Sequence, residues 1–280
     1  MTGGQALAVL VGALTGFLVA LTWIRPSIER SPEELIRANV RGARVPAVLG
    51  LPLSIGVIMG AGVAYLLDRA TSLAITSASV VLAVIVVAGV SAVAGYADDR
   101  RGDEPARGFG GHLKAGLSGK VTGGLVKIAG VGMAGLAAAA LTGGDWFLIE
   151  CTVLVGLTAN LINLLDRAPG RAAKGGFLIA LPLVVLGSAV WATAAAGLLG
   201  ALAACTRPDL KEEAMLGDAG ANPVGAVLGL GLALSLDRTG RLVALGLLLA
   251  LNLASERLSF SKGIERTAWL RALDRWGRRN

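Results

Sequence analysis

Long apolar runs alternate with short polar segments along most of the chain. Runs of about twenty mostly apolar residues have the length that a helix needs to cross roughly 30 Å of hydrocarbon. The stretch 175–205 is too long for one crossing and contains Pro182, Gly187 and Ser188, so it predicts two short helices. The pattern predicts an all-α, polytopic membrane bundle of about nine transmembrane helices, at 5–24, 47–67, 73–95, 119–142, 146–165, 175–187, 189–205, 220–236 and 240–257.

Composition supports this assignment to a membrane. Hydrophobic residues make up 54% of the chain and charged residues 16%, and the mean hydropathy is +0.69. One soluble core would not hide so much apolar surface. Gly and Ala are abundant in the apolar runs, and small residues allow helices to approach closely where no hydrophobic force drives them together. We therefore expect residues 1–257 to form a single transmembrane domain.

The basic residues predict an orientation, because cytoplasmic loops hold most of the Lys and Arg of a membrane protein. With the N-terminus outside, the outer turns keep only Arg69, Arg238 and Arg241. This N-out, C-in topology, expected in the plasma membrane, accounts for most of the net charge of +7 without a nucleic-acid partner, which would need one accessible basic patch. The inner segments are then 25–46, 96–120, 166–174, 206–218 and the tail from 257.

The last segment, 258–280, predicts a cytoplasmic amphipathic helix. Apolar residues gather on one side and cationic residues on the other, which is typical of a helix that lies on an anionic inner leaflet. A flexible tail is the alternative, and the arginines of the segment are also candidates for nucleotide binding. The apolar side comprises Ile264, Trp269, Leu270, Leu273 and Trp276.

Carboxylates stand at the inner borders of the predicted helices. Asp98 and Asp99 are adjacent in "GYADDRR" and repel one another at neutral pH, and a Mg²⁺ ion or a nearby cation relieves that repulsion. A solvated loop with local ion pairs is the alternative. Asp218 lies in a tight turn that opens a helix, where a capping role is the alternative to a functional one. For Glu256 we expect a structural hydrogen bond.

Polar residues also enter two of the apolar runs. Asn160, Asn163 and Asp166 form a stripe along the inner end of one helix, which should face the bundle interior because lipid exposure would be costly. Hydrogen bonding between helices is the alternative for this stripe. Lys120 and Lys127 begin the fourth helix, and a lysine as deep as Lys127 costs on the order of 2.5–3.5 kcal/mol unless it snorkels or finds an anion. A phosphate or one of the aspartates would serve as that anion.

These elements, in this order, resemble the polyprenyl-phosphate N-acetylhexosamine-1-phosphate transferase superfamily, which includes phospho-N-acetylmuramoyl-pentapeptide transferase. "GYADDRR" is similar to the aspartate pair of the family, and "GLSGKVTGG" to the "LSxK" start of its next helix. "NLINLLDR" resembles its N-x-x-N-x-x-D signature, and "AMLGDAGANPVG" its "MGD-x-G" loop. The segment "RANVRGARVPAVLG" is similar to the family's first cytoplasmic loop.

The resemblance implies an enzyme, a glycosyl-1-phosphate transferase. Such an enzyme transfers a sugar-1-phosphate from a nucleotide sugar, usually UDP-linked, to a polyprenyl phosphate in cell-wall biogenesis and releases the nucleoside monophosphate. Mg²⁺ is the expected cofactor, with Mn²⁺ as an alternative, and a homodimer is one possible assembly. The implied metal ligands are Asp99 and Asp218. The catalytic residues are Asp98, Asp99 and Asp166, and the substrate contacts are Lys120, Lys127, Asn160, Asn163, Arg167 and Arg171.

The chain also departs from the family pattern. Where the family has "DGLDGLA", the chain has "DRAPGRA", so Pro169 replaces an aspartate and Arg167 and Arg171 enter the loop. These arginines could clamp a diphosphate or only add to the inner positive charge. The histidine-rich loop of the family is absent, and His112 is the only histidine. Two alternatives therefore stay open: a catalytically degenerate relative that binds polyprenyl phosphate or a cell-envelope partner, and, less favoured, a secondary transporter.

Overall fold

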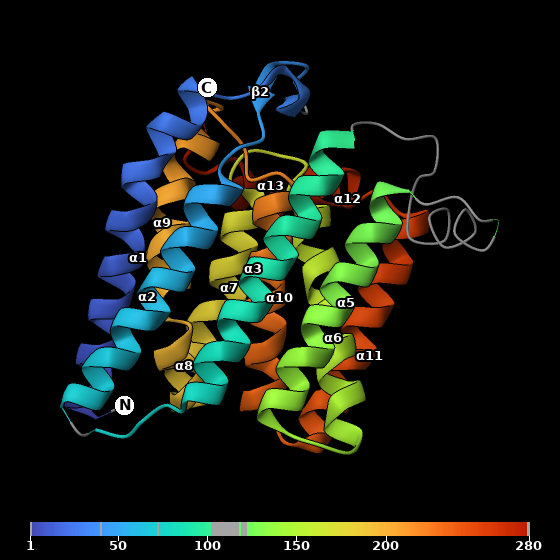
Figure 1. The fold of residues 1–280 in the computed structure, drawn as a ribbon. Coiled ribbons are helices and arrows are strands. Elements are labelled where there is room, and N and C mark those ends of the chain that lie inside the picture. Colours follow the sequence, from blue (N-terminus) through green and yellow to red (C-terminus); the bar gives the residue numbers. More distant parts are fainter. Residues whose placement is uncertain (1, 40, 72, 102–117, 119–121, 279–280) are drawn as a thin grey trace.

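The computed structural model describes residues 2–39, 41–71, 73–101, 118 and 122–278. Helices make up almost all of the regular structure, and a two-stranded antiparallel sheet is the exception (Figure 1). The elements are α1 (Gly3–Glu29), η1 (Glu33–Leu35), β1 (Ile36–Ala38), β2 (Arg44–Pro46), α2 (Gly50–Ala70), α3 (Ala78–Arg101), α5 (Gly123–Thr142), α6 (Trp146–Leu165), α7 (Arg171–Leu186), α8 (Ala189–Ala194), α9 (Ala196–Leu210), α10 (Asp218–Ser235), α11 (Arg238–Arg257), α12 (Phe260–Arg266) and α13 (Ala268–Arg275).

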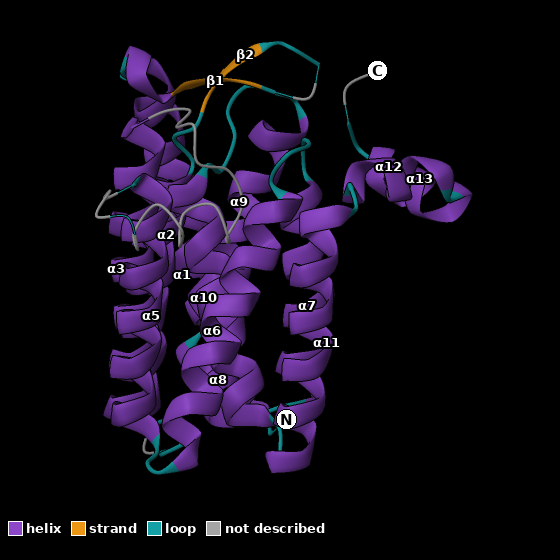
Figure 2. Cartoon of the chain, turned by 90° about the vertical axis from the view of Figure 1, so that its right-hand side faces the viewer, coloured by secondary structure: helices purple, strands orange, loops and turns teal. Residues whose placement is uncertain are grey.

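The chain is all-α and consistent with a helical membrane bundle. Six of its described helices, α1, α2, α3, α5, α6 and α11, are long and apolar enough to cross a membrane. The shorter helices α7, α9 and α10 run alongside them (Figure 2). The N-terminus lies at one end of the bundle, and the β-hairpin, α12 and α13 lie at the other (Figure 1).

The centre of the bundle is α10. It packs against α6, α3 and α2, and nearly all of its residues are buried. Glycines allow this contact: a Cβ on Gly225 would lie 2.4 Å from the Cα of Ala159 on α6, and one on Gly95 would lie 2.2 Å from the carbonyl oxygen of Asp218. Since neither position tolerates a side chain without a shift, the C-terminal end of α3 is held against the start of α10.

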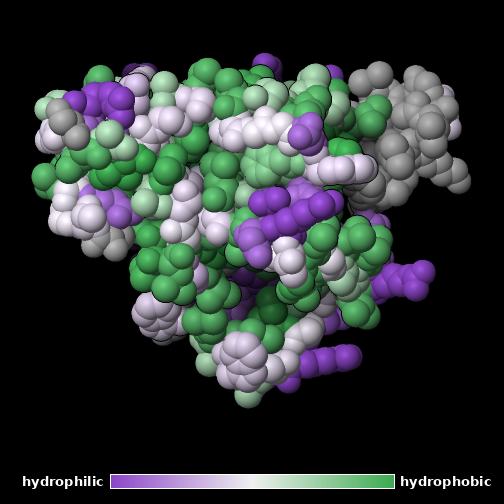
Figure 3. All heavy atoms as spheres, turned by 90° about the horizontal axis from the view of Figure 1, so that it is seen from below, coloured by the Kyte–Doolittle hydropathy of each residue, from purple (hydrophilic) through white to green (hydrophobic). Residues whose placement is uncertain are grey.

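The far end of the bundle, opposite the hairpin, is mainly hydrophobic with a few hydrophilic patches (Figure 3). An ion pair joins two helices there: Arg241 of α11 donates from Nε to the buried Glu150 of α6 at 2.6 Å. Asp68, at the end of α2, accepts hydrogen bonds from the backbone N–H groups of Ile75 and Thr76. These bonds organise the turn before α3.

Several boundaries differ from the sequence prediction. The helix expected at 73–95 begins at Ala78, because the turn bound by Asp68 precedes it, and it continues to Arg101, so Asp98 and Asp99 lie in its last turns. The helix expected at 189–205 breaks at Ala195 into α8 and α9. The single helix expected within 258–280 is two short helices, because Thr267 has an extended backbone.

Candidate functional site

A lysine lies between two carboxylates at the end of the bundle that carries the β-hairpin. Lys127 reaches from the second turn of α5, and its ammonium group is 2.8 Å from Asp98 of α3 and in direct contact with Asp218 of α10. All three side chains are about four-fifths buried. The lysine that looked costly in the sequence therefore has anionic partners, and these compensate for its burial.

Asp99 has a different role from its neighbour. Its two carboxylate oxygens accept hydrogen bonds from the backbone N–H groups of Asp218 at 3.0 Å and Ala219 at 2.9 Å. These N–H groups are free of helical partners at the start of α10, where the helix dipole also favours an anion. The backbone carbonyl of Asp99 accepts a hydrogen bond from Arg37 of β1. Asp99 thus joins α3, α10 and the hairpin.

Asn163 connects the helix α6 to the same cluster. Its amide nitrogen donates to a carboxylate oxygen of Asp218 at 2.9 Å and to the side-chain oxygen of Asn222 at 3.1 Å. Asn222 is 2% exposed, and its own amide nitrogen has no hydrogen-bond partner among the described residues. Asn163, held in turn by Asn222, thus binds one carboxylate oxygen of Asp218 while Lys127 binds the other.

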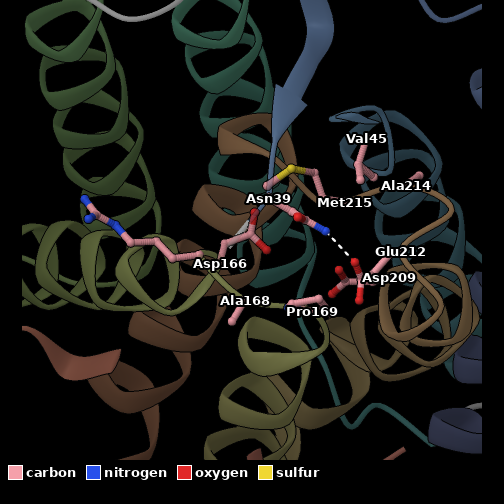
Figure 4. Close-up of a pocket in the computed structure, with 10 residues that line it drawn as sticks. Asn39, Val45, Asp166, Ala168, Pro169, Asp209, Glu212, Ala214 and Met215 are labelled. Carbon is pink, nitrogen blue, oxygen red and sulfur yellow. Dashed lines mark hydrogen bonds between the residues drawn. The ribbon is translucent and has the colours of Figure 1, made fainter. Parts of the chain in front are cut away.

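Asp166 lies outside this cluster, in a small pocket beside it. The pocket is formed by the loop after α6, the end of α9 and the hairpin, and Figure 4 shows Asp166, Asp209 and Glu212 around it. Asn39 donates to Glu212 at 2.5 Å (Figure 4). Burial, together with the negative charges of Asp209 and Asp218, raises the pKa of Asp166 well above its usual range. Asp166 is thus a buried carboxyl that favours its protonated form.

The other expected substrate contacts are distributed differently. Asn160 donates to Asn252 of α11 at 2.5 Å, which is the interhelical bond that the sequence left as an alternative. Arg167 is exposed beside the Asp166 pocket. Arg171 is 7% exposed and makes a two-pronged ion pair with Asp274 of α13, at 2.8 and 3.0 Å. Lys120 lies outside the described residues.

Three contributors to the site were not predicted from the sequence. Arg37 and the hairpin that carries it gave no signal beyond the similarity of their segment to a family loop. Asp209 accepts the backbone N–H of Gly170 at 3.0 Å and so holds the loop after Asp166. Asn222 follows Asp218 by four residues, which places it on the same helix face one turn later. This spacing is the one sequence feature that could have indicated Asn222 as part of the site.

The cluster contains two carboxylates and one ammonium group, so its charges suit both a bound cation and a bound anion. Within the described part of the chain, no group of three or more His, Cys, Asp or Glu side chains has the arrangement of a metal site. Asp98, Asp218 and Lys127 nevertheless place two negative charges and one positive charge at the hairpin end of the bundle, next to the amide groups of Asn163 and Asn222. No protein-family model matches the chain, and a search of curated proteins finds no significant match.

Proposed function

We propose that the protein transfers a sugar-1-phosphate from a nucleotide sugar, UDP-linked in our expectation, to a polyprenyl phosphate at the cytoplasmic face of the plasma membrane. The proposed reaction joins an oxygen of the acceptor phosphate to the sugar-linked phosphorus of the donor. The bond from that phosphorus to the nucleotide breaks, and the electron pair leaves on the nucleoside monophosphate. One observation carries the proposal: Lys127, Asp98 and Asp218 converge from three helices at one membrane border.

The charges of this cluster suit the proposed reaction. Two anionic substrates must meet at one phosphorus, and phosphoryl transfer depends mainly on positioning and on neutralising charge. Lys127 is the described cation that is buried beside the carboxylates, and its ammonium group is the candidate to contact a substrate phosphate. Asn163 holds Asp218 in place, and Asp98 is the candidate to accept a proton from the acceptor phosphate.

The donor set also fits a divalent cation. Mg²⁺ prefers oxygen ligands and usually takes one or two protein carboxylates together with water and substrate phosphates. Asp218 fits this pattern better than Asp99, because both oxygens of Asp99 already accept backbone hydrogen bonds. The metal would neutralise developing negative charge on the phosphates.

We further propose that the bundle crosses the membrane nine times, with the N-terminus outside and residues 258–280 in the cytoplasm. The support is the distribution of charge: the inner segments carry most of the basic residues, and the carboxylate cluster lies at that same end. α7, α9 and α10 would then be short crossings. α9 and α10 are mostly buried within the bundle, whereas α7 exposes Leu178, Leu181 and Leu186 to its surroundings.

The test is release of nucleoside monophosphate by the purified protein in lipid nanodiscs. A panel of UDP-sugars is offered with polyprenyl phosphate and Mg²⁺, and each component is omitted in turn. We expect release that needs both substrates, and a loss of about a hundredfold or more for Asp218→Asn. The exposed Glu213, on the loop just before α10, provides the matched control Glu213→Gln. Absence of turnover with every donor, or an unaffected Asp218→Asn variant, contradicts the proposal.

A second candidate function is binding of polyprenyl phosphate without chemistry. Two observations favour it: an ammonium group already occupies the position between the carboxylates, and Arg171 of the altered loop is committed to Asp274. The same nanodiscs distinguish the two functions, since a binding protein would retain the lipid but release no nucleotide.

A further inference from the structure

A groove of about 220 Å³ opens beside the carboxylate cluster, between α1, α2 and α3. We call it the α1–α3 groove. Its walls come from the end of α1, the segment before β1, the start of α2 and the last part of α3. The residues that shape its apolar part are Trp23, Pro26, Leu35, Val48, Leu51 and Tyr96.

The apolar part of the groove faces the surroundings of the bundle. Trp23, Leu51 and Tyr96 are each about half exposed, although they are large and hydrophobic. Tryptophan and tyrosine at such a height are typical of the border between hydrocarbon and headgroups. In a membrane this space offers water few polar partners, so a hydrocarbon chain is its natural occupant.

The polar end of the groove is cationic. Arg30 lines it at the end of α1, and Arg100 lies over the ring of Tyr96 at 6.0 Å from the ring centre. Guanidinium groups bind phosphate through parallel hydrogen bonds. A lipid whose chain lay in the groove would therefore meet positive charge at the height of a phosphate headgroup.

The inner wall of the groove belongs to the proposed active site. Ala219 lines the groove, and its backbone N–H donates to Asp99 at 2.9 Å. A Cβ on Gly50 would lie 2.4 Å from the carbonyl carbon of Ala219, so the backbones of α2 and α10 touch there. A chain in the groove would therefore lie one residue from Asp218.

We propose that the α1–α3 groove holds the prenyl chain of the acceptor lipid, with Arg30 beside its phosphate. This inference rests on the proposed function, because it assigns the acceptor of that reaction. An ordinary phospholipid is the less favoured occupant, since a purely structural lipid has no need to border the start of α10.

A pair of matched substitutions tests the groove. Leu51→Trp fills it, whereas Leu66→Trp adds the same side chain at another exposed position of α2, away from the groove. The probe is a polyprenyl phosphate with a photoreactive group on its chain, bound to the protein in nanodiscs without donor. We expect labelling of groove residues, about tenfold weaker in Leu51→Trp because the chain loses roughly two buried CH₂ groups, and unchanged in Leu66→Trp. Arg30→Gln should weaken labelling without filling the groove.

The possible outcomes test the groove assignment and the proposed reaction separately. Three results would overturn the groove assignment, even if nucleotide is released. The label could appear only on other helices, or both tryptophan variants could lose labelling equally. The third is full displacement of the probe by an equal amount of phosphatidylglycerol. Groove labelling without nucleotide release overturns the proposed reaction and leaves the groove assignment standing. Where turnover occurs, Leu51→Trp should raise the KM for the acceptor about tenfold and leave the KM for the donor unchanged.

Discussion

Asp274 ties the C-terminal segment to the loop that follows Asp166, and its removal should release that segment. Its carboxylate receives two hydrogen bonds from Arg171 and a further contact from Arg278. Lys174 donates to the backbone carbonyls of Leu273, Asp274 and Trp276, which satisfies the end of α13. Residues about one hundred positions apart in the chain are thereby joined at the hairpin end of the bundle.

The magnitude follows from burial. Asp274 and Arg171 have side chains that are 4% and 8% exposed, so Asp274→Ala leaves a buried guanidinium without its main partner. Breaking such a pair costs about 3–5 kcal/mol, which corresponds to a rise of roughly two to nearly four orders of magnitude in the opening constant of the segment. Hydrogen exchange of residues 258–278 in nanodiscs measures this constant directly.

The assay needs a control on the same helices. Arg275→Ala on α13 removes an exposed ion pair with Glu265 and should change the exchange of the segment by less than about tenfold. The doubly substituted Arg171→Met, Asp274→Leu variant removes both charges of this pair and leaves Arg278 with the carbonyl of Pro169, so it should recover part of the lost protection. Equal exchange in Asp274→Ala and Arg275→Ala, or no recovery in the double variant, would refute this account of the attachment.

The attachment should also respond to acid. Burial alone would oppose ionisation, but the hydrogen bonds from Arg171 and the charges of Arg171 and Arg278 hold the pKa of Asp274 below its usual value. The unfolded pKa is near 3.9, so the stabilisation is fully present above about pH 5 and is lost as the pH falls through the lower folded pKa. Exchange of the segment should therefore be independent of this group between pH 5 and 8 and should increase below about pH 4.

Three other predictions concern separate parts of the bundle. Gly95→Ala should lower stability by about 1–3 kcal/mol in a thermal scan, because its Cβ meets the backbone of Asp218, whereas Gly89→Ala, with its nearest neighbour at 3.9 Å, should be neutral or slightly stabilising. Asn222→Ala should raise the KM for the donor of the proposed reaction several-fold, because Asn163 loses a hydrogen-bond partner. The melting temperature should stay nearly unchanged, since the substitution also removes the buried Asn222 amide nitrogen that has no partner among the described residues. Glu150→Gln should cost about 1–3 kcal/mol, because Arg241 loses its carboxylate partner and keeps the carbonyl of Leu236, without changing turnover at temperatures where the protein stays folded.

The helices could be predicted from the sequence because the membrane imposes a length and an apolar character on each of them. Lys127 could be singled out for the same reason, since a charge within an apolar run needs a partner. The identity of that partner could not be predicted, because Asp98 and Asp218 come from helices whose rotation depends on packing. The separate role of Asp99 could not be predicted either, since the sequence does not show which partners each of two adjacent aspartates contacts until the position of α3 in the bundle is known.

The loops were harder to predict, because short polar segments lack periodicity. The β-hairpin is three residues long on each side and carries alternating charge and apolar groups that fit many conformations. The ion pair of Arg171 could not be predicted for a different reason. An arginine in a segment with positive-inside bias has no sequence feature that distinguishes a structural ion pair from a phosphate contact. Only the position of Asp274, more than one hundred residues later, makes that distinction.

The glycines that bring α1, α2 and α9 into backbone contact have a consequence for how lipid would enter. A Cβ on Gly16 would lie 2.3 Å from the carbonyl oxygen of Gly197, and one on Gly60 would lie 2.4 Å from the Cα of Gly197. Backbone contacts have no side-chain rotamers to rearrange, so these helices form a block that keeps its shape. α11, which packs mainly on α6, is held far less tightly. The α1–α3 groove therefore borders the rigid side of the molecule, and a lipid chain would enter a preformed space at little cost in ordering.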